Sequence, residues 1–402
     1  MRTGLARYAS VCCRAEAWLK ACFCSHRALD TVSNSLITPS SSFAELAGRL
    51  GTTPRRATDG LDSRKGVRVL ATIVSYEPER EGLTLLVDTL ASQGIDVLIV
   101  DNSESEAGRV SAHAVALAFA AGYVGNPVNV GVAAAQNIGL RTARKHGFSH
   151  VLLLDQDSTM QMKTVDQLVA AFVSLQEAGQ KVAAVGPSLV DPRSGYRAPF
   201  PRLRHVRMEK CVPDPGEVVE CDVLISSGCL ISLAAVDRVG PLDEGLFIDY
   251  VDFEWCVRAR SRGFKVFGVA DAVLAHTIGE SPIRVLGRVI SLHSPLRNYY
   301  FIRNGLLFLG KPYLSLRWRA HLLYRVAAQF VLFGCLCPQR LQRIGWMLRG
   351  FWDGVLGRSG RLGGPAGLKP LRPQWKVTQP TSVPGRAADG QEGKRPLPLA
   401  VE

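Results

Sequence analysis

The sequence lacks an uninterrupted apolar stretch long enough to cross a bilayer. The best candidate, VAAQFVLFGCLC (326–337), falls well short of the roughly 20 apolar residues that a spanning helix needs. The basic N-terminal stretch also has no apolar core of the kind found in signal peptides. We therefore predict a protein that neither spans a membrane nor is exported.

Paired cysteine motifs with zinc-type spacing are also missing. The ten cysteines are scattered along 402 residues, and Cys22 and Cys24 have no histidine or cysteine partners at a suitable distance. We interpret the cysteines as reduced thiols of a cytosolic protein.

Acidic residues are outnumbered, with 35 Asp and Glu against 48 Lys and Arg, for a net charge of +13. Part of the basic excess lies in residues 1–65 and beyond Arg317, around a more balanced centre. This distribution favours an anionic surface or a small anionic ligand over a nucleic-acid groove.

Four regions follow from composition. Residues 1–65 read as a disordered basic leader and residues 358–402 as a disordered tail rich in Pro and Gly. Between them, residues 66–310 are predicted to form the main domain and residues 311–357 an amphipathic helical region. The chain is 47% hydrophobic, enough for a sizeable core.

The central region alternates between two patterns. VRVLATIVSY (67–76) and DVLIVDNS (96–103) are apolar, β-branched runs, and between them LTLLVDTLASQG (83–94) has apolar residues at helical spacing. Such alternation predicts an α/β fold with a mostly parallel sheet covered by helices on both faces. Ligands of such sheets bind beyond the carboxyl ends of the strands.

Polar residues follow three of these strands. They are Ser75 and Tyr76, then Asp101 and Asn102, then Asp155 and Asp157. Any one aspartate could simply cap the next helix or turn. Their joint placement instead favours one crevice, with Asp155 and Asp157 directing oxygen ligands toward Mg²⁺ or Mn²⁺ and Gln156 turned away. Such a metal would accompany a diphosphate.

The segment NVGVAAAQNIGL (129–140) predicts a helix that begins with small residues. Small side chains permit close approach of a ligand to the backbone, and a helix N-terminus favours an anion. Tight helix packing would use the same residues. We place Asn129, Gly131 and Asn137 among the candidate donor-binding residues.

Several motifs in order resemble the GT-A family 2 glycosyltransferases. They are IVSYEP, VDNS, NVGVAAAQNIG, LLLDQDS, SSGCLIS, GPLDEGLFIDYVDFEWCVRARSRGF and LAHTIGES. DQDS, FIDYVDFEW and HSPLRNYYFIRN are similar to the bacterial rhamnosyltransferase subgroup. The resemblance covers about residues 67–357 and implies the GT-A nucleotide-diphospho-sugar transferase fold.

The resemblance also implies roles for individual residues. The nucleotide would lie near Thr72, Ser75 and Glu77, although Glu77 replaces the usual asparagine. Asp101 would bind the base, Asp155 would face the ribose and metal, and the metal ligands would be Asp157 and His276.

The general base implied by the resemblance is Asp252, predicted in the first turn of a helix, where the helix dipole stabilises its charge. The family has an acidic pair at 251 and 252, but Val251 leaves a single carboxylate. Asp249 is the alternative base. Arg258 and Arg260 are expected to form ion pairs with the acids of this segment.

The implied enzyme is an inverting glycosyltransferase that moves L-rhamnose from dTDP-L-rhamnose to a hydroxyl of a lipid-linked or polysaccharide acceptor in bacterial cell-surface glycan synthesis, such as O-antigen. A UDP donor carrying galactofuranose or glucose is the alternative, and a non-catalytic nucleotide-sugar binding protein is a further one. A covalent mechanism would need a nucleophile beneath the sugar, and the sequence contains no nucleophile elbow or comparable signature.

The segment RLQRIGWMLRGFWDGVLG (340–357) has apolar residues three and four positions apart, with arginines among them. Its apolar face could pack on the domain. Alternatively, it lies on an anionic membrane surface. The second interpretation predicts a cytoplasmic enzyme peripherally associated with the inner face of the cytoplasmic membrane.

Overall fold

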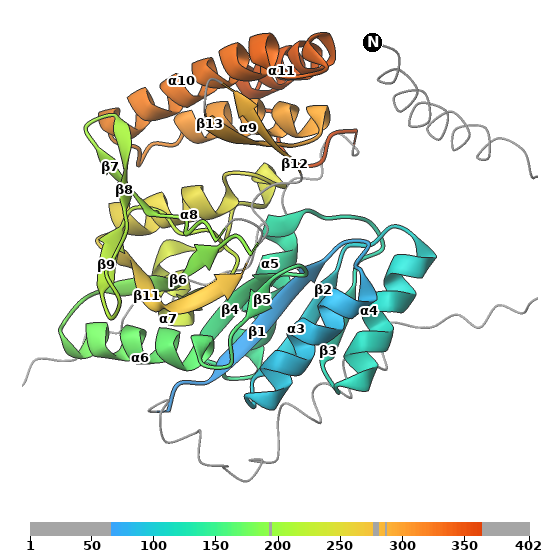
Figure 1. Ribbon diagram of the computed structural model, residues 1–402, viewed down its shortest axis with the longest axis vertical. Helices are drawn as coiled ribbons and strands as arrows, with labels where there is room; N and C mark the ends of the chain where they lie inside the picture. The colour runs from blue at the N-terminus through green and yellow to red at the C-terminus, as the bar shows by residue number, and fades with distance from the viewer. Residues whose placement is uncertain (1–65, 193–194, 276–280, 286–287, 364–402) are drawn as a thin grey trace, which may run out of the picture. The chain divides into compact units, whose positions relative to one another are not determined.

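A computed structural model of the protein describes residues 66–192, 195–275, 281–285 and 288–363. At its centre is a nine-stranded sheet in the order β3-β2-β1-β4-β10-β6-β11-β5, with β9 also paired to β11 (Figure 1). Six of these strands (β1, β2, β3, β4, β6 and β11) run in one direction, and β5, β9 and β10 run against them. The prediction of a mostly parallel sheet is confirmed.

The strands of this sheet are β1 (Val69–Ser75), β2 (Asp96–Asp101), β3 (Gly122–Gly125), β4 (His150–Asp155), β5 (Thr159–Met160), β6 (Val182–Val190), β9 (Val218–Cys221), β10 (Cys229–Ser232) and β11 (Lys265–Ala275). Two separate hairpins are formed by β7 (Phe200–Arg204) with β8 (Arg207–Cys211) and by β12 (Ser281–Val285) with β13 (Arg288–Leu292).

Helices cover both faces of the sheet. One face carries α3 (Arg80–Ser92), α4 (Glu106–Ala118) and α6 (Thr164–Glu177), and the other carries α5 (Val132–Lys145), α7 (Leu233–Val239) and α8 (Val251–Ser261). Every residue of β1 is buried, as expected for a β-branched strand between two helical layers. The helix predicted after β1 is confirmed as α3, whose buried residues are Leu83, Leu86, Val87 and Leu90.

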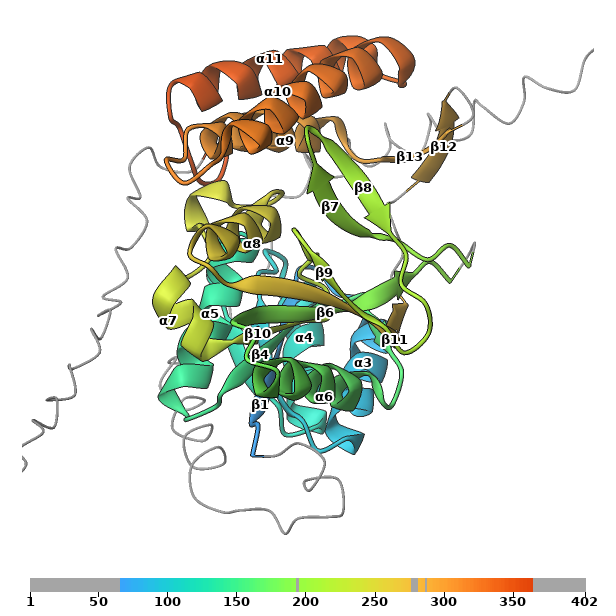
Figure 2. The ribbon, with the colours of Figure 1, turned by 90° about the vertical axis from the view of Figure 1, so that its left-hand side faces the viewer.

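A further layer of helices follows the sheet in the chain. It consists of α9 (Pro295–Leu309), α10 (Leu316–Val331), the short π-helix η3 (Leu332–Leu336) and α11 (Arg340–Val355). Both α10 and α11 pack against α9 (Figure 2). Gly350 lets α11 pack close to α9, because a Cβ at this position would lie 2.5 Å from the backbone oxygen of Tyr299 in α9. No helix within the described ranges is long and apolar enough to cross a membrane.

The segment after α11 returns to the domain. The amide of Gly360 donates to the oxygen of Gly245, and Arg361 forms an ion pair with Glu104 (2.6 Å). The first residues of the predicted tail, 358–363, therefore make contacts with the domain. The predicted leader (1–65) and the rest of the tail (364–402) lie outside the described residues.

Candidate active site

Asp101, at the end of β2, is fully buried and surrounded by hydrogen-bond donors. Its Oδ1 accepts from the hydroxyls of Ser75 (2.9 Å) and Ser103 (2.7 Å), and its Oδ2 accepts from the hydroxyl of Tyr123 (2.9 Å). Burial, together with the charge of Asp101, raises the pKa of Tyr123, so the phenol stays a donor. The network fixes the carboxylate at the carboxyl edge of the sheet.

Thr72 lies deeper than the predicted nucleotide contact requires. It is fully buried in β1 and faces α5, where a Cβ at Gly139 would lie 2.3 Å from both its Oγ1 and its Cγ2. The structure therefore places Thr72 in the packing between sheet and helix.

Glu77 is exposed just beyond β1 and holds the start of α4. Its carboxylate accepts from the amides of Glu104 (2.9 Å) and Ser105 (2.8 Å) and from the Ser105 hydroxyl. These hydrogen bonds, first that of the Ser105 hydroxyl, lower the pKa of Glu77. In this structure, the residue that replaces the family's asparagine holds Ser105, the N-cap residue of α4, in place.

The ends of β1 and β4 are tied together by Gln156. Its amide oxygen accepts from the backbone N–H of Tyr76 (2.7 Å), and its Nε2 donates to the backbone oxygen of the same residue (3.1 Å). Gln156 is thus engaged with β1 while Asp155 is half-buried and Asp157 is exposed at the same edge. This pairing is consistent with the prediction that the Gln156 side chain turns away from the metal site of Asp155 and Asp157.

A serine pair links the two acidic segments of the site. The Ser227 hydroxyl donates to Oδ2 of Asp155, and the Ser226 amide donates to Oδ2 of Asp252 (3.2 Å). The turn before β10 therefore holds the end of β4 next to the start of α8. Four residues from three separate segments, two of them carboxylates, converge here.

Asp252 lies in the first turn of α8, as predicted, and is half-buried. Burial raises its pKa to about 6, against hydrogen bonds from Phe253 and Ser226 that lower it; the charges of Asp155 and Asp249 add to the rise. A carboxylate with a pKa near neutrality is suited to accept a proton from a hydroxyl.

The other two acids of this segment are paired. Asp249 forms a bidentate contact with Arg297 of α9 (3.0 Å), and buried Glu254 forms one with Arg258 (2.7 Å). The expected ion pair is thus confirmed for Arg258. Arg260 instead pairs with acids at the end of β9, so its predicted partner is wrong.

The turn that precedes α8 has an unusual backbone. Phe247, Asp249 and Tyr250 all have positive φ (65°, 60° and 64°), a conformation that costs non-glycine residues energy. Asn304 of α9 compensates, because its Nδ2 donates to the carbonyl oxygens of Leu246 (2.8 Å), Ile248 (2.5 Å) and Asp249 (3.1 Å).

The N-terminus of α5 packs on the same turn. Gly131 has a φ of 87°, and a Cβ there would lie 2.6 Å from the carbonyl oxygen of Phe247, which accepts from the Val132 amide (2.7 Å). Asn129 accepts from the Gly131 amide (2.9 Å). Glycine is thus required at this position for a close backbone approach. The group that approaches is the Phe247 carbonyl of the protein itself, whereas the sequence predicted a ligand there.

Asn137 is buried in α5 and holds another segment of the protein. Its amide group exchanges hydrogen bonds with the backbone of Leu242 (2.9 and 3.0 Å) and donates to Glu244 (2.9 Å). These contacts hold the segment that leads into the turn before α8. Asn137 therefore supports the candidate site from within the core.

The predicted metal ligands are only partly described. His276 lies outside the described residues, and among the residues that are described no group of three or more His, Cys, Asp or Glu is placed to hold a metal. Of the residues predicted around the metal, Asp155 and Asp157 are described, and both carry carboxylate oxygens. Mg²⁺ commonly takes one or two carboxylates and completes its shell with waters and substrate phosphates, so this donor set fits a metal that arrives with a diphosphate.

Comparison with known proteins decides the family. A scan against protein-family models finds no match. A curated relative, the dTDP-rhamnosyl transferase RfbF of Shigella flexneri, is 32% identical over 256 residues, which cover 62% of this chain and 82% of the relative. The chain belongs to the GT-A family 2 glycosyltransferases, in the bacterial rhamnosyltransferase subgroup.

Two solved structures align at lower identity. The mannosyltransferase PcManGT from Pyrobaculum calidifontis, in complex with GDP-Man and Mn²⁺, is 14% identical with a TM-score of 0.44, covering 80% of this chain and 85% of that one. S. aureus TarS 1–349, in complex with UDP-GlcNAc, is also 14% identical with a TM-score of 0.45, covering 73% and 82%.

For this glycosyltransferase, sequence reasoning missed the residues that connect the site. Ser226, Ser227, Arg297 and Asn304 were given no role. Each lies in a motif that carried the family resemblance, SSGCLIS or HSPLRNYYFIRN. The available signal was the presence of several polar side chains among the apolar and aromatic residues of these motifs.

Proposed function

We propose that the enzyme transfers L-rhamnose from dTDP-L-rhamnose to a hydroxyl of a lipid-linked or polysaccharide acceptor, with inversion at the anomeric carbon. The similarity to the Shigella flexneri dTDP-rhamnosyl transferase supports the donor. The convergence of Asp155 and Asp252 through the Ser226–Ser227 turn supports the chemistry, and this is the observation on which the mechanism rests.

In the proposed reaction, Asp252 removes the proton from the acceptor hydroxyl as its oxygen attacks the anomeric carbon and the nucleoside diphosphate departs. Asp249 is held by Arg297 and Glu254 by Arg258, whereas within the described part of the chain Asp252 accepts hydrogen bonds from the amides of Ser226 and Phe253 and has a raised pKa.

Asp155 and Asp157 would hold Mg²⁺ or Mn²⁺, which when bound neutralises charge on the diphosphate. Ser75 and Asp101 form the floor of the proposed nucleotide site, since they are the last residues of β1 and β2 at the carboxyl edge of the sheet. Asn129 and Gly131 shape the neighbouring helix start.

We also propose that the enzyme works at the cytoplasmic face of the inner membrane, in cell-surface glycan synthesis. Support comes from α11, where Leu341, Leu348, Trp352 and Val355 are each about half exposed or more and recur at intervals of seven, four and three residues. Such spacing places them on one face of the helix.

A donor panel tests the proposal. dTDP-L-rhamnose, UDP-glucose and UDP-galactofuranose are compared for binding and slow hydrolysis by the full-length protein, with Mg²⁺ and with chelator. We expect dTDP-L-rhamnose to bind most tightly and its binding to weaken with chelator and in Asp157→Ala. Tighter binding of a UDP sugar would replace the donor assignment, and donor binding that is equal in chelator would refute the metal proposal.

A further inference from the structure

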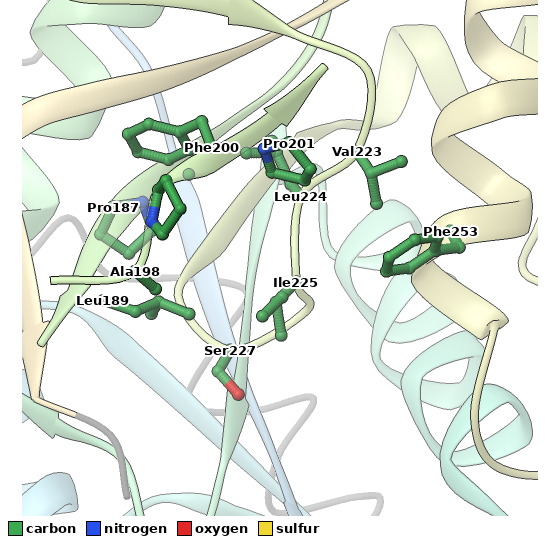
Figure 3. Close-up of a pocket in the computed structure, with 12 residues that line it drawn as sticks. Pro187, Leu189, Ala198, Phe200, Pro201, Val223, Leu224, Ile225, Ser227 and Phe253 are labelled. Atoms are coloured by element: carbon green, nitrogen blue, oxygen red, sulfur yellow. The ribbon is translucent and has the colours of Figure 1, made fainter. Parts of the chain in front are cut away.

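A small cavity lies between the end of β6, the β7 strand and the start of α8. Its volume is about 120 Å³, and its walls include Pro187, Leu189, Phe200, Val223, Ile225 and Phe253 (Figure 3). Among the described residues that line it, Ser227 supplies the only polar side chain. The Ser227 hydroxyl already donates to Asp155, so the cavity offers an occupant almost no side-chain hydrogen bonding.

Two residues that line the cavity are linked to the carboxylates of the proposed site. Ser227 joins it to Asp155, and Phe253 directly follows Asp252 in α8. Ile225, next to the Ser226 amide that binds Asp252, is 45% exposed, so the cavity wall reaches the protein surface. A molecule whose hydroxyl is within reach of Asp252 therefore has an apolar recess beside it.

The chemistry of the walls selects the occupant. Burying a hydroxyl without a hydrogen bond costs about 1 to 3 kcal/mol, so sugar hydroxyls and a nucleotide are poorly suited to this recess. An apolar cavity of about 150 Å³ is known to hold benzene, which indicates that 120 Å³ accommodates a group of about five carbons. That is larger than the single methyl group of a 6-deoxy sugar.

We propose that this cavity binds an aliphatic group of the acceptor, next to the hydroxyl that receives the sugar. The proposal rests on the proposed function, since it takes Asp252 as the base on the acceptor side. It narrows the acceptor to a molecule with a hydrocarbon portion close to its reacting sugar.

A series of n-alkyl β-D-glucosides, from methyl to octyl and below their micelle concentrations, tests the proposal. Their binding to the full-length protein is measured by ligand-observed NMR. Affinity should rise about threefold to fourfold with each methylene until about five carbons are buried and then level off. A flat series, or a rise that continues at the same slope to octyl, would overturn the proposal.

Two variants locate the effect. Ala198 lines the cavity, so Ala198→Phe should fill it, and Ile225→Asp should place a charge at its mouth. Each should reduce the gain from methyl to octyl at least fivefold. Val110→Asp, at a 61% exposed position of α4 away from the cavity, is the matched control and should leave the series unchanged. An equal reduction in the control would refute the assignment.

Donor binding separates this proposal from the function on which it rests. If the wild-type protein neither binds nor hydrolyses any donor of the panel, the proposed function fails whatever the alkyl series shows. If donor hydrolysis is normal and the alkyl series is flat, only the cavity proposal fails. If Ala198→Phe weakens donor binding and leaves the alkyl series unchanged, the cavity holds part of the donor and the proposal is wrong.

Discussion

The acidic residues of the site differ more in their surroundings than in their chemistry. Asp101 is buried among four donors, Asp249 and Glu254 are paired with arginines, and Asp252 is half-buried with two backbone donors. Burial raises the pKa of Asp252 to about 6. This environment, and not sequence position alone, identifies Asp252 as the proposed base.

Asp252→Asn should keep the shape of the side chain and remove its ability to accept a proton. We expect kcat to fall by about a hundredfold to ten-thousandfold while the donor dissociation constant stays unchanged. In the wild type, activity should be lost as the pH falls through about 6, because protonation removes the base. Steady-state rates between pH 5 and 8 and calorimetric donor binding measure both effects.

Asp249→Asn and Glu254→Gln are the comparison variants for this prediction. Each should disturb an ion pair, with a smaller loss of kcat and no removal of the acidic limb of the pH profile. A greater loss of kcat in Asp249→Asn than in Asp252→Asn would transfer the role of base to Asp249.

Sequence alone could place some of these residues and not others. Asp101, Asp155 and Asp252 were placed correctly at strand ends and in a first helical turn, because local patterns determine those positions. Thr72 and Asn137 look equally polar in the sequence, yet both lie in the core. Their burial depends on contacts with Gly139 and with the Leu242 backbone, which no local pattern contains.

At the scale of elements, α9 determines the shape of the turn before α8. In the sequence, the motif HSPLRNYYFIRN contributes only to the family resemblance, but in α9 its arginine and asparagine side chains bind other parts of the protein. Arg303 is buried, donates to the backbone of Leu246 (3.0 Å) and, with Asn304, holds a turn that contains three positive φ angles. No local pattern in the sequence shows that polar side chains of this helix bind backbone carbonyl groups.

Asn304→Asp should destabilise the protein, because the change removes the NH₂ donor and brings a negative charge to three carbonyl oxygens. We expect a loss of about 2 to 4 kcal/mol in the free energy of unfolding, measured with urea. Turnover should fall as well, since the turn positions Asp249 and leads into Asp252.

Asn298→Asp, on the same helix, is the matched control. Asn298 accepts a hydrogen bond from buried Arg343 (2.6 Å), and a carboxylate can accept the same bond. This variant should lose much less stability than Asn304→Asp. Equal losses in the two variants would mean that a charge in α9, not the missing donor, causes the effect.

At the scale of the whole molecule, the C-terminal helices are part of the domain and also present an apolar surface. Met347 of α11 is fully buried with Ile302 of α9, so the packing interpretation of the 340–357 segment is correct for one face. Arg343, one of the arginines of this segment, is also buried. Leu348 and Trp352 lie on the exposed side (49% and 61%), which is the surface that we propose binds the membrane.

The double variant Leu348→Glu with Trp352→Glu tests whether this surface binds membranes. Truncation would be a poorer test, because α11 packs on α9 and α9 supports the active-site turn. Both side chains are exposed, so the fold and donor hydrolysis should be retained. Burying a large apolar side chain is worth about 1.5 to 3 kcal/mol, and the new charges also repel an anionic surface. Partitioning to vesicles containing phosphatidylglycerol, measured by sedimentation, should therefore fall at least tenfold.

Leu117→Glu, at a 69% exposed position of α4, should leave partitioning unchanged. If the wild type and the double variant partition equally, this face of α11 is not the membrane-binding surface.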